Sequence, residues 1–158
     1  MADWTNTVAP EVTPTLDEVV RRRADLYQAI LGLERAAARP AVAREDEGVE
    51  GVLGALAELE HEIADHIDIT ERPDGLYDEF VEAAPRLSRS VQVLRDEHPD
   101  MQAAAAALRS MLEDRRDTVS VDDARDEIAH VLGRLVKHRQ HGADLLWEAY
   151  NLDTGGAE

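Results

Sequence analysis

Residues 49–66 of the chain, VEGVLGALAELEHEIADH, carry a large apolar or imidazole side chain at alternating intervals of three and four positions. The positions between them hold mostly glycine, alanine and acids. Because an α-helix turns once every ~3.6 residues, this spacing gathers the larger side chains on one face. The stretch therefore predicts an amphipathic helix that begins near Glu45 and ends before the Arg-Pro-Asp-Gly turn at residues 72–75. Its inward face consists of Val49, Val52, Leu56, Leu59, Ile63 and His66.

The same alternation recurs in three further stretches. The first helix is expected at residues 16–38 and the fourth at 120–154, while the third runs from about 77 to 112 with kinks or a break at Pro85 and Pro99. The inward face of the first helix consists of Leu16, Val19, Arg23, Leu26, Ile30, Leu33 and Ala37. No stretch has the strict alternation of a half-buried strand. Four amphipathic helices joined by short polar links predict an all-α fold, an antiparallel up-down-up-down four-helix bundle.

The length of 158 residues fits one domain. Residues 1–15 include Pro10 and Pro14 and lack helical periodicity, which predicts a flexible leader. The bundle is expected to comprise residues 16–156, because a glycine pair at 155–156 ends the fourth helix.

The composition argues against several classes of function. The net charge of −17 makes this an acidic protein, and such a surface repels phosphate backbones, so nucleic-acid binding is not expected. No stretch reaches the roughly 18 consecutive apolar residues of a membrane span, and the first residues do not resemble a secretory signal. No membrane association and a cytoplasmic location are therefore expected. The absence of cysteine excludes disulfides and thiolate metal ligands.

Common enzyme signatures are missing from the sequence. It has no glycine-rich phosphate loop, no serine nucleophile elbow and no His-Glu-x-x-His zinc pair. The tyrosines at positions 27, 77 and 150 are expected at the boundary of the core, with their hydroxyl groups in water. The sequence does not decide whether the protein is an enzyme, but the missing motifs argue against enzyme activity.

The histidines are the most informative polar residues. Of the six, His66, His98 and His138 fall on inward positions of three different helices, whereas the other three lie off the inward faces. Imidazoles that point into a bundle core from facing helices are what a buried metal site requires. The alternative is three separate histidines, each hydrogen-bonded at the edge of the core. His66, His98 and His138 are the candidate metal ligands.

Three segments resemble bacterial hemerythrin-like domains. They are Asp65–Glu71 (DHIDITE) with the Pro-x-Gly-Leu turn that follows, Arg95–His98 (RDEH) and His138–Tyr150 (HRQHGADLLWEAY). The likeness covers most of residues 16–156. It implies a four-helix bundle that holds two irons on histidines and bridging carboxylates, and a role in binding oxygen or in handling oxygen, nitric oxide or iron.

The chain departs from the family pattern at several ligand positions. The resemblance implies a histidine on the first helix, and residues 16–38 contain none. Where the family has further ligands, this sequence has Thr70, Leu94, Gln102 and Ala143, with the carboxylates of Glu71 and Asp144 one place late.

The predicted positions along the bundle axis also separate His66 from His98 and His138. If the chain reverses at the turn of residues 72–75 and again before the fourth helix, His98 and His138 share a level, whereas His66 lies on the order of 25 Å away. These departures predict a degenerate di-iron site.

Two functions stay open at this point. The first is a binding protein related to metal or oxygen handling. In it a single zinc, nickel or iron ion binds weakly at His98 and His138 if a carboxylate such as Glu34 or Glu97 turns inward. Iron is the cofactor that the resemblance implies. The alternative is a metal-free helical interaction or assembly module, because the inward faces account for the fold without any ligand. In either case helix faces are available for a homo-oligomer.

Overall fold

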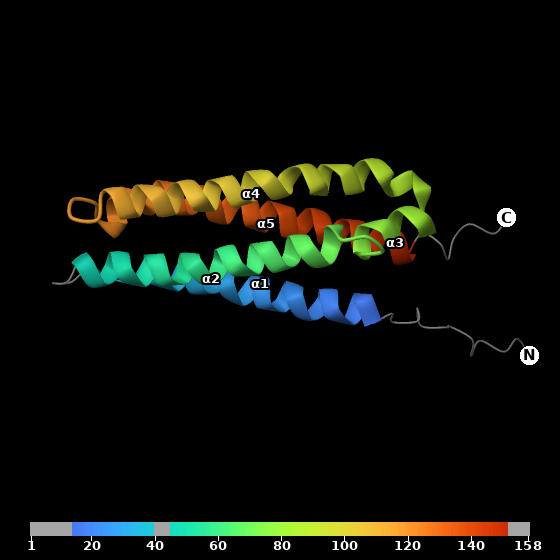
Figure 1. Ribbon diagram of the computed structural model, residues 1–158, viewed down its shortest axis with the longest axis horizontal. Coiled ribbons are helices and arrows are strands. Elements are labelled where there is room, and N and C mark those ends of the chain that lie inside the picture. Colours follow the sequence, from blue (N-terminus) through green and yellow to red (C-terminus); the bar gives the residue numbers. More distant parts are fainter. Residues whose placement is uncertain (1–13, 40–44, 152–158) are drawn as a thin grey trace, which may run out of the picture.

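The computed structural model describes residues 14–39 and 45–151, and most of them belong to four long helices. The long helices are α1 (Pro14–Ala38), α2 (Glu45–Glu71), α4 (Ser88–Asp114) and α5 (Val121–Asn151). Figure 1 shows that they lie side by side and alternate in direction along the chain. The described ranges contain no strand. The prediction of an all-α, antiparallel four-helix bundle is confirmed.

The predicted domain limits fall largely on residues outside the described ranges. Residues 1–13 of the predicted leader are not described, whereas Pro14 and Thr15 open α1 and do not belong to a leader. Proline suits the first position of a helix, because its missing N–H has no partner there in any case. The predicted end at residue 156 also lies outside the described part.

The break predicted at Pro85 is present. The chain forms the short helix α3 (Leu76–Ala83), a 3₁₀ turn η1 (Pro85–Leu87) and then α4. Pro85 causes the break, since a proline cannot donate a helical hydrogen bond and clashes with the preceding turn. Pro99, in contrast, lies inside α4, which continues through it.

The turn between α2 and α3 does not reverse the chain. Figure 1 shows α3 beyond the end of α2, at the end of the bundle where α4 begins, so the reversal occurs at η1. Asp74 takes a left-handed conformation (φ 57°) in this turn. A Cβ at Gly75 would lie 2.7 Å from the carbonyl oxygen of Arg72, so only glycine allows this close approach of α3 to α2.

The predicted inward faces form the core. The larger apolar cluster fills the end near the α4–α5 connection and reaches Ile63, Met101 and Leu135. The smaller cluster lies around α3 and includes Phe80 and Leu94. The three inward histidines occupy the boundary between the clusters, because each helix has large apolar residues of one cluster before its histidine and of the other after it.

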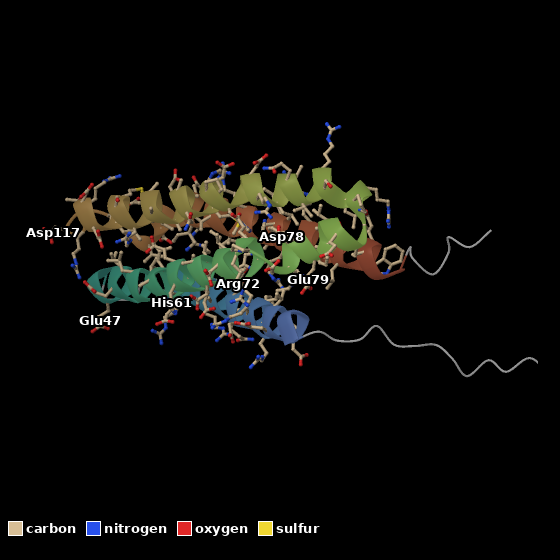
Figure 2. The ribbon with its side chains drawn as sticks, turned by 45° about the vertical axis from the view of Figure 1, so that its right-hand side comes forward. Glu47, His61, Arg72, Asp78, Glu79 and Asp117 are labelled. Carbon is tan, nitrogen blue, oxygen red and sulfur yellow. The ribbon has the colours of Figure 1, made fainter. Side chains whose placement is uncertain are left out.

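Charged side chains cover the outside of the bundle, as Figure 2 shows for Glu47, His61 and Asp117. Some pair across elements: Arg72, in the turn after α2, binds Glu18 on α1 at 3.1 Å, and Arg95 on α4 binds Asp78 on α3 at 3.2 Å. None of the described helices is both long enough and apolar enough to cross a membrane.

Candidate metal centre

The three inward histidines converge in the core. His66 comes from α2, His98 from α4 and His138 from α5, and their residues are 7%, 1% and 3% exposed. The Nε2 atom of His138 lies 3.0 Å from Nε2 of His66 and 3.3 Å from Nε2 of His98. One nitrogen of each ring lies within 4.8 Å of the others, an arrangement that could hold a metal ion.

The predicted separation of His66 from the other two is therefore wrong. The estimate placed the chain reversal at residues 72–75, whereas the structure has it at η1. After His66 the chain continues in the same direction along the bundle axis through the rest of α2 and through α3. After the reversal, the ten residues from Ser88 to His98 bring it back by roughly 15 Å. This return puts His98 at the level of His66.

Two glutamates bind the outer nitrogens, the Nδ1 atoms, of His98 and His138. Nδ1 of His98 lies 2.5 Å from Oε1 of Glu71, and Nδ1 of His138 lies 2.8 Å from Oε2 of Glu97. A carboxylate accepts hydrogen bonds, so each Nδ1 carries the proton and the neutral ring presents the lone pair of Nε2 inward. Carboxylates in this position orient metal-binding histidines and raise their basicity. These pairings cross from one helix to another, and spacing along the chain does not predict them.

The inward nitrogens of His98 and His138 face each other without a proton between them. With both Nδ1 atoms protonated, the Nε2 lone pairs of His98 and His138 face each other at 3.3 Å. His66 can donate one proton to His138, and the hydroxyl of Tyr77, 3.3 Å from Nε2 of His98, can donate another. That arrangement leaves the repulsion between the two lone pairs, which a cation bound among the three nitrogens would remove. Nδ1 of His66 is buried and has no hydrogen-bond partner among the described residues.

Burial keeps the three imidazoles neutral. It lowers the pKa of His66 well below the ordinary value, and the neighbouring histidines lower it further. Burial also lowers the pKa of His98 and brings the pKa of His138 down to about 4, although the glutamate bound to each ring opposes the shift. Neutral imidazole is the form that binds metal ions, so the site is ready for a cation at neutral pH.

These shifts predict that acid destabilises the metal-free protein. Below about pH 6.5 the unfolded chain binds more protons than the folded one, so stability is complete above that pH and is lost as the pH falls. For His138 the loss runs from pH 6.5 to about 4 and amounts to about 3 kcal/mol. Urea denaturation of metal-free protein at pH 7 and pH 5 should detect about 2 kcal/mol of this loss. The His138→Gln variant, which lacks the buried imidazole, should lose less stability over the same interval; equal losses would contradict the assignment.

Tyr77 is a buried part of the site, and its predicted place at a wet boundary is wrong. Its ring stacks on that of His98 with centroids 5.8 Å apart, and Arg95 lies over the ring at 5.4 Å. Burial raises the pKa of Tyr77 far above neutrality, so its hydroxyl is a hydrogen-bond donor. The short helix α3 brings it there. Tyr27 is partly exposed as predicted, and the side chain of Tyr150 lies outside the described residues.

The three remaining histidines lie off the core, as the sequence indicates. His61 is 68% exposed in its side chain and points away from the bundle (Figure 2). His130 is exposed and accepts a hydrogen bond from Arg134. His141 is partly exposed, and its Nδ1 lies 2.7 Å from Oε1 of Glu97, so this glutamate links it to the site.

The residues do not fit the di-iron centre that the hemerythrin resemblance implies. At the position of the family's helix-two glutamate, Thr70 donates its hydroxyl to the carbonyl of His66 at 2.7 Å, and Glu71 turns to His98. Glu34 is exposed, and both oxygens of Glu97 are bound to histidine Nδ1 atoms, so neither carboxylate turns inward. The inward donors among the described residues suit one ion.

Comparisons with known proteins provide no information about this site. No family model matches the chain, and neither a curated protein nor a solved structure matches it.

Proposed function

We propose that this bundle is a metal-binding protein that holds one divalent transition-metal ion on Nε2 of His66, His98 and His138. One observation carries the proposal: three neutral imidazoles from three helices direct unprotonated or exchangeable nitrogens to one point, and two of them are oriented by carboxylates. Such carboxylate–histidine pairs are the usual surroundings of protein metal ligands.

The spacing of the nitrogens supports a single ion. Nitrogens that bind one tetrahedral metal ion at about 2.0–2.1 Å stand about 3.3 Å from each other. The two separations from His138, 3.0 and 3.3 Å, are close to this value, and the nitrogens of His66 and His98 lie within 4.8 Å of each other. Imidazole suits zinc, nickel and iron.

Three protein ligands leave at least one position of the ion open. Structural zinc sites use four protein ligands, whereas sites with three bind water or an exogenous molecule in the open position. The proposed relation to hemerythrin-like domains then lies in the bundle and in metal or oxygen handling, with one ion in place of two irons.

The test is a metal count. Protein stripped with a chelator is loaded with Zn²⁺ or, without oxygen, with Fe²⁺, freed of excess metal and analysed for bound ions. We expect one ion per chain in the parent and in the His130→Ala control, whose imidazole is exposed. A count of zero would favour the metal-free interaction module, and two irons with an oxo-bridged absorption band after exposure to air would establish a di-iron centre.

A further inference from the structure

A small cavity adjoins the proposed metal site. Its volume is about 30 Å³, which is room for about two water-sized molecules. His66 and His138 line it on one side, together with Tyr77, and two arginines, Arg23 and Arg139, line it as well. The remaining walls are mostly apolar, so a molecule inside would be largely shielded from water. The size excludes all but the smallest ligands.

The two arginines are close together, and no carboxylate of the described residues pairs with either of them. Arg23 takes an inward position of α1, and its Nη2 lies 3.5 Å from the carbonyl oxygen of Arg139. The guanidinium of Arg139 lies over the ring of Tyr27 at 4.4 Å, and its buried Nε has no hydrogen-bond partner in the part of the chain that the structure describes. Among the described residues neither guanidinium forms an ion pair with a carboxylate, although the chain has 34 acidic residues and only 17 basic ones.

Two like charges in a partly buried place repel each other. Burial and the charge of Arg139 lower the pKa of Arg23 from its ordinary value. A neighbouring anion relieves such repulsion, and it is worth more here than at the surface because the local dielectric is lower. A divalent ion on three neutral imidazoles adds further positive charge at the same cavity.

We propose that this cavity binds a small monovalent anion of two or three heavy atoms, with one end on the open position of the metal ion and the other facing Arg23 and Arg139. The inference rests on the proposed metal site and names its ligand class. Planar guanidinium groups are suited to such anions, since they offer several N–H donors in a fixed geometry. The phenol of Tyr77 is a further donor at the same cavity.

The experiment uses protein loaded with Co²⁺, whose visible spectrum reports its ligands, and azide as the anion. Azide should change the spectrum of the parent in a saturable way. Arg23→Met should weaken azide binding by about tenfold or more while the cobalt count stays the same, and Arg23→Lys should recover part of the loss. The matched control is Arg22→Met, because the neighbouring Arg22 pairs with Asp65 at 3.0 Å and does not line the cavity.

The outcomes separate the two proposals. If cobalt does not bind the parent, the metal site itself is wrong and the anion proposal falls with it. If cobalt binds, but azide leaves the spectrum unchanged or binds Arg22→Met and Arg23→Met equally, the anion proposal alone is overturned. Arg139→Met serves as a second variant on α5 in case Arg23→Met does not fold, as judged by circular dichroism.

Discussion

Replacing Leu94 by Asp is expected to destabilise the protein by several kcal/mol and to leave much of it unfolded at room temperature. Leu94 is 2% exposed and lies in the smaller apolar cluster, beside the cavity next to the histidines. The change removes the burial of a leucine side chain, about 2–3 kcal/mol, and places a charged carboxylate in the core, which costs several kcal/mol more in desolvation. A typical domain is stable by only about 5–15 kcal/mol, so the loss is a large part of the total.

The neighbouring residue supplies the control. Val93 is 46% exposed, so Val93→Asp adds the same negative charge one position away at the surface of the same helix. Urea denaturation followed by circular dichroism should give a midpoint near the parent for Val93→Asp and a much lower one for Leu94→Asp. Equal midpoints for the two variants would show that the face of α4 assigned to the core is wrong.

The fold was predictable because it depends on local spacing. An inward face such as Val52, Leu56, Leu59 and Ile63 identifies both the helix and the side that is buried, whatever the helix packs against. The same spacing predicts that all three histidines point inward, although imidazole is a polar side chain. Spacing within a helix thus predicted which residues reach the core.

Positions along the bundle axis were not predictable in the same way. They depend on where the chain reverses, and the turn at residues 72–75 and the break at Pro85 look alike in a sequence. The close approach at Gly75 continues the chain into α3, and only after Ala84 does it turn back. Placing the reversal before α3 instead of after it displaced the predicted position of His66 by about 25 Å, which is roughly twice the length of this eight-residue helix.

The spacing of residues along the helices also does not predict which glutamates bind the histidine rings. Glu97 precedes His98 directly, yet it binds His138 on the neighbouring helix, and Glu71 crosses from α2 to α4. Long side chains reach between helices in directions that depend on the packing, so only the three-dimensional structure pairs them. Their place on the outer nitrogens is what supports a three-histidine site over three independent histidines.

The largest effect on metal binding is expected for His138. Both short nitrogen–nitrogen distances of the site involve its Nε2, and its Nδ1 is bound to Glu97. His138→Ala removes a ligand and leaves two. Loss of an outer-shell partner typically lowers metal affinity by about 10–100-fold, so loss of the ligand itself should lower it by at least about 100-fold.

Competition for Zn²⁺ with a chromophoric chelator measures this affinity. Two further variants serve as a control and as an intermediate case. His130→Ala, two turns earlier on α5 and exposed, should bind zinc as the parent does. Glu97→Gln keeps all three ligands but weakens the acceptor of the Nδ1 proton, so its affinity should lie between those of the parent and His138→Ala. If His138→Ala binds zinc as tightly as His130→Ala, the metal lies elsewhere on this acidic chain, and the convergence of the three imidazoles serves the packing of the core alone.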